Sequence, residues 1–387
     1  MRERFKVVTL GCKVNQYESF SIIDRLQRIA SEEGGPDGDY AIINTCAVTH
    51  VACHQSRQAI SKLMRENPSS TLLITGCYVD LYPEELQERF GKAILIPTPY
   101  KLRIPEMVGT SNFEYSSLFP ISFPQFPPKP KTRARAYLKV QDGCEGRCSY
   151  CVVPLARGSY KSLDMEEVVR QAKELEEAGF EELVITGIHL GKYGVEKGEA
   201  SLERLISQLI SNTSQLRFRL SSIEPKEVTP LLLRMIRETN RICRHLHIPL
   251  QSGSAKILRG MGRDYLPDFY RDLVHQVKGS LPDSSLGTDV MVGFPGEDES
   301  SFLETLQFLE ALPITYLHVF PYSPRKGTLA YSFKRSISHG ELRRRVATLK
   351  ELDRRKRGQF MAQMLGSVLQ FLPERSSKEG ELIGHTD

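Results

Sequence analysis

Short β-rich runs and helical patterns alternate along almost the whole chain. In the first 110 residues, strands are predicted at residues 5–10, 40–44, 71–75 and 93–96, and helices at 19–31, 54–66 and 83–90. Parallel strands need a crossover connection, which is usually a helix, so this alternation is typical of parallel α/β folds. Residues 1–110 are therefore predicted to form a small parallel α/β domain.

A second strand–helix series follows a proline-rich stretch, residues 111–132, which is predicted to be a linker. Its strands are predicted at residues 136–140, 182–186, 218–221, 245–248, 286–292 and 316–320. Its helices are predicted at residues 165–178, 201–211, 229–238, 255–259, 265–277 and 299–311, with a further basic helix at 339–364. Six strands with helices between them indicate a partial (βα)6 barrel over residues 133–365, because a complete barrel of this type has eight.

Composition and charge limit the remaining possibilities. The chain has 387 residues, of which 40% are hydrophobic and 26% charged, and no apolar run approaches the roughly 20 residues of a membrane helix. The N-terminus enters a strand directly and does not resemble a signal peptide, so a cytoplasmic location is expected. The net charge is +5, and basic residues are clustered in residues 129–135 and 343–357. Such clusters can contact nucleic acid, although a solvated helix face and a polar linker are the simpler interpretation.

The most informative motif is the Cys-x3-Cys-x2-Cys sequence of Cys144, Cys148 and Cys151, directly after the first strand of the second series. A structural zinc site would need a fourth Cys or His ligand nearby, and none follows. Three thiolates suit a [4Fe–4S] cluster that leaves one iron open. An open iron can bind S-adenosylmethionine (SAM), whose reductive cleavage gives a 5′-deoxyadenosyl radical.

Three other cysteines, Cys12, Cys46 and Cys77, each follow a predicted strand of the first domain. The carboxyl ends of parallel strands meet at one edge of the sheet, where open α/β sheets bind their ligands, so these three side chains are expected to gather there. From the residues alone, a purely structural role for them stays open. Cys53 does not share this setting.

Two parts of the chain resemble the radical SAM methylthiotransferase family. One comprises residues 138–151, Pro154 and residues 156–158, and the other comprises residues 9–18, 44–46 and 75–77. The similarity extends over essentially the whole chain. It implies a second [4Fe–4S] cluster on Cys12, Cys46 and Cys77. Cys53 and Cys243 match no ligand position of the family and are predicted to be small buried residues.

The resemblance also implies SAM-binding residues at the mouth of the barrel. They are predicted to be Tyr150, Gly187, Ser222, Glu224, Gln251, Ser252 and Asp289. Each polar residue has an orienting or capping role as its alternative. His245 and His247, which flank Leu246, are predicted to be core or lining residues rather than metal ligands.

Members of this family act on isopentenyladenosine in tRNA, on threonylcarbamoyladenosine in tRNA, or on an aspartate of a ribosomal protein. Residues 11–18, 187–194 and 245–254 resemble the threonylcarbamoyladenosine group most. This implies that SAM is used twice, once to methylate a sulfur at the second cluster and once to activate C2 of the adenine beside the anticodon.

The resemblance further implies a tRNA anticodon loop as substrate, an electron donor such as flavodoxin or ferredoxin, and a monomer. Residues 366–387 are expected to be an incomplete β-barrel (TRAM-like) RNA-binding segment. An iron–sulfur electron carrier or scaffold without a substrate is the alternative from a different class.

Overall fold

The computed structural model describes residues 4–32, 38–130, 134–198, 201–334, 337–376 and 381–387. Two compact units can be distinguished. The first comprises Met1–Glu145, Val152–Phe180 and Thr186–Ile188, and the second comprises Gly146–Cys151, Glu181–Ile185 and His189–Asp387. Lys131 and Arg133, which belong to the predicted basic cluster, lie outside the described residues.

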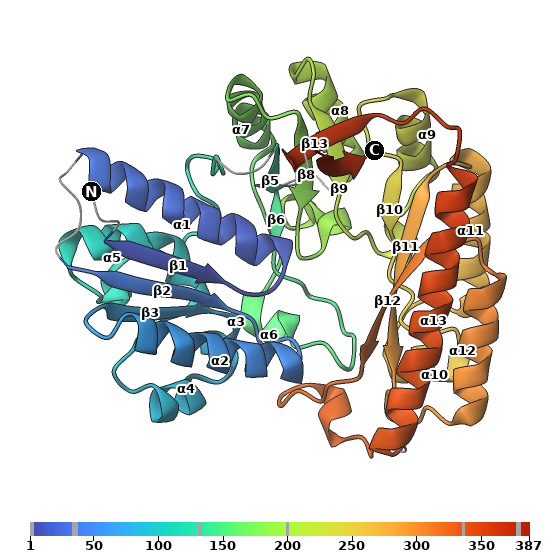
Figure 1. Ribbon diagram of the computed structural model, residues 1–387, viewed down its shortest axis with the longest axis horizontal. Coiled ribbons are helices and arrows are strands. Elements are labelled where there is room, and N and C mark those ends of the chain that lie inside the picture. Colours follow the sequence, from blue (N-terminus) through green and yellow to red (C-terminus); the bar gives the residue numbers. More distant parts are fainter. Residues whose placement is uncertain (1–3, 33–37, 131–133, 199–200, 335–336, 377–380) are drawn as a thin grey trace. The chain divides into compact units, whose positions relative to one another are not determined.

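The first unit contains a four-stranded, fully parallel sheet in the order β1–β2–β3–β4 (Figure 1). Its strands are β1 (Phe5–Thr9), β2 (Tyr40–Thr45), β3 (Thr71–Gly76) and β4 (Ile94–Ile96). Its helices are α1 (Lys13–Glu32), α2 (His50–Glu66), α3 (Cys77–Leu81), α4 (Pro83–Arg89) and α5 (Ile104–Thr110). The predicted parallel α/β domain is confirmed.

Successive side chains of a strand point in opposite directions, so different helices pack against the two faces of this sheet. On β2, Tyr40 and Ile42 belong to a core with residues of α1 and α5. Ala41 and Ile43 belong to a second core with residues of α2, α3 and α4. The sheet therefore lies between two layers of helices, and each layer packs against one face of the sheet.

Two helices begin earlier than the sequence predicted. Helix α1 begins at Lys13, immediately after Cys12, and its first turn contains the buried Val14. Helix α2 begins at His50, where the Thr49 side chain accepts a hydrogen bond of 3.0 Å from the Ala52 amide. Cys53 therefore lies inside α2, where it is buried as predicted.

The remainder of the first unit carries short elements around the cysteine motif. They are η1 (Thr98–Arg103), η2 (Tyr115–Ser117), β5 (Arg135–Lys139), β6 (Gln141–Asp142), α6 (Val153–Arg157), β7 (Lys161–Ser162) and α7 (Met165–Glu177). Strands β6 and β7 pair antiparallel. From residue 111 to residue 130, the 3-10 turn η2 is the only helix or strand among the described residues.

The second unit contains a parallel sheet in the order β10–β11–β12 and the parallel pair β8–β9. Its parallel strands are β8 (Glu182–Thr186), β9 (Arg217–Leu220), β10 (His245–His247), β11 (Ser285–Val292) and β12 (Tyr316–Pro321). Its helices are α8 (Leu202–Asn212), α9 (Pro230–Glu238), α10 (Ala255–Gly260), α11 (Pro267–Ser280), α12 (Glu299–Ala311) and α13 (His339–Gln363). With β5, all six strands predicted for the second series are present.

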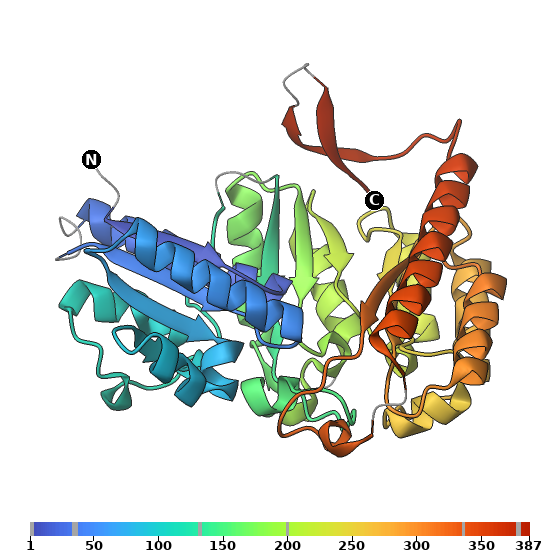
Figure 2. The same ribbon diagram turned by 60° about the horizontal axis from the view of Figure 1, so that its bottom comes forward.

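The chain ends in an antiparallel hairpin of β13 (Phe371–Ser376) and β14 (Leu382–Thr386), which follows α13 (Figure 2). Arg217 donates to the Gln370 carbonyl at 3.3 Å, and Arg219 donates to the Thr386 carbonyl at 2.6 Å. Among the described residues, no helix is long and apolar enough to cross a membrane.

Candidate functional site

The three loops that follow β1, β2 and β3 bring Cys12, Cys46 and Cys77 to one edge of the sheet, as predicted. A Cβ added at Gly11 would lie 2.8 Å from the Cβ of Cys46 and 3.1 Å from its Sγ. A Cβ at Gly76 would lie 2.7 Å from the Thr45 amide nitrogen. Both glycines also have positive φ, so only glycine fits these close approaches without strain.

Asn15, in the first turn of α1, ties two of these loops together. Its side-chain amide donates to the carbonyls of Leu10 at 2.9 Å and Thr45 at 3.0 Å. Its carbonyl oxygen accepts a hydrogen bond of 2.6 Å from Nη2 of Arg157. No specific role for Asn15 was predicted, because its partners lie 5, 30 and 142 residues away.

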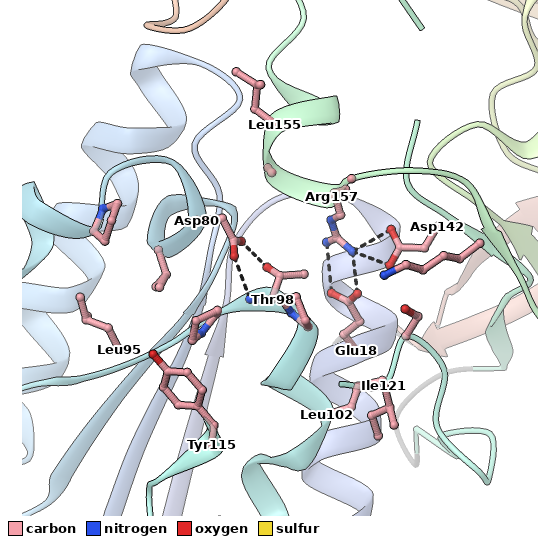
Figure 3. Close-up of a pocket in the computed structure, with 18 of the residues that line it drawn as sticks. Glu18, Asp80, Leu95, Thr98, Leu102, Tyr115, Ile121, Asp142, Leu155 and Arg157 are labelled. Carbon is pink, nitrogen blue, oxygen red and sulfur yellow. Dashed lines mark hydrogen bonds and ion pairs between the residues drawn. The ribbon is translucent and has the colours of Figure 1, made fainter. Parts of the chain in front are cut away.

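A buried network of charges surrounds Arg157 (Figure 3). Glu18 accepts hydrogen bonds from Lys101 at 2.7 Å, Lys139 at 2.9 Å and Arg157 at 2.7 Å. Asp142 pairs with Lys139 at 2.6 Å and with Arg157 at 3.2 Å. Burial alone raises the pKa of Glu18, but Arg157, Lys101 and Lys139 outweigh it and hold that pKa well below its ordinary range. Asp80 is a third carboxylate that interacts with Lys101 and Arg157, so three cations face three carboxylates here.

The charges of this network act on one of the neighbouring thiols. Burial, with smaller contributions from the thiols of Cys77 and Cys12, raises the pKa of Cys46 to about 12. Burial also raises the pKa of Cys77, an effect that Arg157 and Lys101 oppose and Asp80 increases. Thiols must lose their protons to bind a metal, so Arg157 and Lys101 favour the ligating form of Cys77. Three thiols gathered at one edge of the sheet suit an iron–sulfur cluster.

The central cysteine motif is divided between the units. In the first unit, the amide of Cys144 donates to the Gly158 carbonyl at 2.9 Å. In the second unit, Ser149 donates from its amide to the Met261 carbonyl at 2.9 Å and from its hydroxyl to the Gly260 carbonyl at 2.8 Å. A Cβ at Gly262 would lie 2.8 Å from the Arg147 carbonyl oxygen, so this segment packs tightly against the end of α10.

Arg263 contacts the motif directly and was missed from the sequence. Its Nη1 lies 3.2 Å from Sγ of Cys148, while Nη2 pairs with Glu224. Its guanidinium also lies 5.0 Å from the ring centroid of Tyr265. A guanidinium that donates to a thiolate sulfur stabilises its negative charge. No sequence signal distinguishes Arg263 from Arg259, which is exposed.

The predicted SAM-binding residues occupy different surroundings. The Tyr150 ring packs edge-on against Phe294, with ring centroids 6.5 Å apart. Gly187 follows β8, and Ser222, which is exposed, follows β9. Glu224 is engaged by Arg263.

Gln251 and Ser252 follow β10. Gln251 is buried and has a φ of +73°, and within the described chain its Oε1 has no hydrogen-bond partner. A non-glycine residue in this conformation is strained, and such residues cluster at functional sites. The Ser252 hydroxyl is 3.1 Å from that of Thr305 and accepts from the Ser254 amide at 3.2 Å, which is the capping alternative.

Asp289, on β11, lies beside two imidazoles. Its Oδ1 is 3.0 Å from Nε2 of His247 and 3.4 Å from Nδ1 of His318.

A cavity of about 850 Å³ lies in the first unit, where Glu18, Asp80, Thr98, Asp142 and Arg157 are among its lining residues (Figure 3). No predicted SAM-binding residue lines this cavity.

Two family models match the chain: the Radical SAM superfamily over residues 138–309, and the uncharacterized protein family UPF0004 over residues 4–96. The threonylcarbamoyladenosine tRNA methylthiotransferase MtaB of Bacillus subtilis is 35% identical over 98% of this chain and 87% of its own length. The MtaB of Aquifex aeolicus is 37% identical over 94% of this chain and 91% of its own length. The chain belongs to the radical SAM methylthiotransferase family.

Other similarities agree with this family. The tRNA-2-methylthio-N(6)-dimethylallyladenosine synthase of Thermus thermophilus is 29% identical over 99% of the chain and 84% of its own length. The radical S-adenosylmethionine methyltransferase TsrM of Kitasatospora setae superposes with a TM-score of 0.59 at 14% identity, over 82% of this chain and 72% of TsrM, which supports the fold alone.

Membership of the radical SAM methylthiotransferase family makes the protein an enzyme and implies SAM and a [4Fe–4S] cluster as its cofactors. The alternative of an electron carrier or scaffold without a substrate is therefore wrong.

Proposed function

We propose that this protein transfers a methylthio group to C2 of N6-threonylcarbamoyladenosine beside the anticodon of tRNA. The observation that carries this proposal is a difference in similarity. Four relatives named as MtaB are 33–37% identical to the chain. Four tRNA-2-methylthio-N(6)-dimethylallyladenosine synthases are 28–29% identical over similar lengths.

Two clusters belong to the proposal. Cys144, Cys148 and Cys151 hold the cluster that binds SAM, and Cys12, Cys46 and Cys77 hold a second [4Fe–4S] cluster. When bound, these groups supply the radical and the sulfur chemistry of the reaction. Asn15 and Arg157 hold the segments of the second site together.

The proposed substrate also sets the partners. Enzymes that modify a base must expose it, and a base in an anticodon loop can be unstacked with little loss of pairing energy. The proposed enzyme is a cytoplasmic monomer that receives electrons from a small donor such as flavodoxin or ferredoxin. The predicted SAM contacts of Tyr150, Gly187, Ser222, Glu224, Gln251 and Ser252 remain part of the proposal.

The substrate is tested by competition. The reconstituted enzyme receives SAM, a reductant and equal amounts of tRNA carrying threonylcarbamoyl- or isopentenyladenosine, and mass spectrometry of the nucleosides follows the products. We expect at least about tenfold more 2-methylthio product on threonylcarbamoyladenosine, because a site built for a polar substituent rejects an apolar one. Preference for isopentenyladenosine, or for the ribosomal-protein aspartate in a parallel assay, would overturn the substrate and leave the reaction class.

The cluster count is tested by iron analysis. Anaerobically reconstituted protein should hold about eight irons per chain, and replacing Cys144, Cys148 and Cys151 by Ala should remove about four. Replacing Cys53 and Cys243 by Ala is the matched control and should leave the iron content unchanged. Wild-type protein that holds only about four irons contradicts the second cluster.

A further inference from the structure

One face of the β10–β11–β12 sheet carries side chains that the proposed reaction does not use. His247 on β10, Asp289 on β11 and His318 on β12 lie on this face, together with Tyr316. Strand pairing explains this position, because Asp289 is directly opposite His318, and Gly287 is opposite both His247 and Tyr316. The strands therefore bring together residues that are as much as 71 positions apart in sequence.

The donor atoms of the three residues converge. Asp289 Oδ1 lies 3.0 Å from His247 Nε2 and 3.4 Å from His318 Nδ1, and the three donor atoms lie within 4.8 Å of one another. Ligands placed tetrahedrally at about 2.0–2.1 Å from a zinc ion are themselves about 3.4 Å apart. The separations of 3.0 and 3.4 Å are close to this spacing, and the third is at most 4.8 Å.

The ring of His247 is also oriented as that of a metal-binding histidine would be. Its Nδ1 lies 3.1 Å from the Tyr316 hydroxyl, which leaves Nε2 directed at Asp289. Metal-binding histidines usually donate their second ring N–H to such an outer partner, which fixes the tautomer. Tyr316 is itself held at 2.9 Å from Nε2 of His245 and lies under the Arg357 guanidinium. A Cβ at Gly287 would collide with the Tyr316 ring, so the glycine makes this arrangement possible.

We propose that His247, Asp289 and His318 bind a divalent transition-metal ion of the zinc type, separate from the six cluster cysteines. Two imidazoles and one carboxylate are a common ligand set for such ions, and three protein ligands leave a position for water or substrate. The side-chain exposure rises from 8% at His247 to 25% at Asp289 and 57% at His318, so the ion enters from the His318 side. This assignment gives Asp289 a ligand other than SAM and does not depend on the proposed tRNA substrate.

The experiment uses the full-length enzyme with its clusters assembled, because empty cysteine sites would take up zinc. Zinc chloride is added, free ion is removed by gel filtration, and zinc and iron are measured by mass spectrometry. We expect about one zinc per chain in the wild type. His318→Ala and Asp289→Asn should each weaken zinc binding at least about tenfold in competition with a chromophoric chelator.

His275→Ala is the matched control, because His275 is an exposed histidine on α11 outside the cluster, and it should keep the zinc. Unchanged iron content and circular dichroism would show that each variant is folded. Zinc-edge X-ray absorption should give nitrogen and oxygen ligands only. Sulfur ligands, equal zinc in the wild type and both variants, or no zinc in the wild type would overturn the site and show that the three residues form only a hydrogen-bonded group.

Discussion

Arg263 is the residue outside the cysteines that the structure connects most directly to the radical chemistry. It reaches the sulfur of Cys148 while Glu224 and the Tyr265 ring hold its guanidinium in place. A hydrogen bond to a ligand sulfur stabilises the reduced, more negative cluster, so its loss lowers the reduction potential. Arg263 is thus a positioning residue rather than a ligand.

We expect Arg263→Ala to lower the reduction potential of the SAM-binding cluster and to slow SAM cleavage about 10- to 100-fold. The potential is measured by a redox titration followed by electron paramagnetic resonance, and cleavage by the yield of 5′-deoxyadenosine. Arg259→Ala, an exposed neighbour on α10, is the control. An unchanged potential in Arg263→Ala would remove Arg263 from this role even if the activity fell.

Glu182 shows how a buried charge contributes to stability. Burial alone raises its pKa, but the hydrogen bonds and charges of Arg219 and Arg217 outweigh burial and lower that pKa from 4.5 to about 2. A carboxylate with a lowered pKa stabilises the fold above its unfolded pKa, and this contribution disappears as the pH falls from 4.5 through about 2. The difference corresponds to roughly 3 kcal/mol.

Glu182→Gln should therefore lower the free energy of unfolding of the apoprotein by about 3–5 kcal/mol at pH 7, since both arginines lose their counter-charge. Between pH 4.5 and pH 2, the stability of the variant should fall less than that of the wild type. Urea unfolding followed by circular dichroism measures both effects. The exposed neighbour Glu181, replaced by Gln, should change neither.

Many basic side chains of helix α13 form ion pairs with acidic residues of the protein. Arg344 pairs with Glu299 and Glu341, Arg354 with Glu351, and Arg357 with Asp353. Arg345 is almost fully buried against Glu297, Glu299 and Glu341, and Lys356 donates to the Leu312 carbonyl at 2.7 Å. Much of this charge is therefore compensated within the protein, which favours the solvated-face interpretation over phosphate contacts for most of the helix.

Two substitutions on α13 separate these roles. Arg343 is exposed, so Arg343→Gln should reduce the slope of log affinity for tRNA against log salt by about 1. Arg345→Gln should leave that slope unchanged and lower the free energy of unfolding by about 3–5 kcal/mol, because Glu297 keeps an unpaired buried charge. Filter binding at several salt concentrations and urea unfolding measure the two effects. A slope that Arg343→Gln does not alter would contradict the phosphate contact.

Over the whole molecule, the two sets of three cysteines lie in different segments, one set at the ends of β1, β2 and β3 and the other between β6 and α6, and should have separate roles. Replacing Cys12, Cys46 and Cys77 by Ala should leave reductive SAM cleavage and abolish methylthio transfer, because the remaining cysteines still provide the open iron. Mass spectrometry of 5′-deoxyadenosine and of tRNA nucleosides checks both outcomes in one reaction. Methylthio product at the wild-type yield would refute this division.

The strands, most helices and the gathering of Cys12, Cys46 and Cys77 could be predicted from the sequence. These features depend on local patterns: apolar periodicity places the strands, and a cysteine directly after a parallel strand must lie at the carboxyl edge. Helix α1 was predicted too short, although Val14 and Tyr17 extend its buried face toward the N-terminus, and helix α3, which begins at Cys77, was not predicted. The ligand roles of the cysteines remain predictions.

Only the tertiary structure decided which polar residues meet. Arg157 reaches Asn15 across 142 residues, and Arg263 reaches Cys148 across 115. His247, Asp289 and His318 come together only because their strands are neighbours in register. A buried, paired arginine and an exposed one have the same letter in the sequence, and the free energy that distinguishes them comes from desolvation and from partners that the fold supplies.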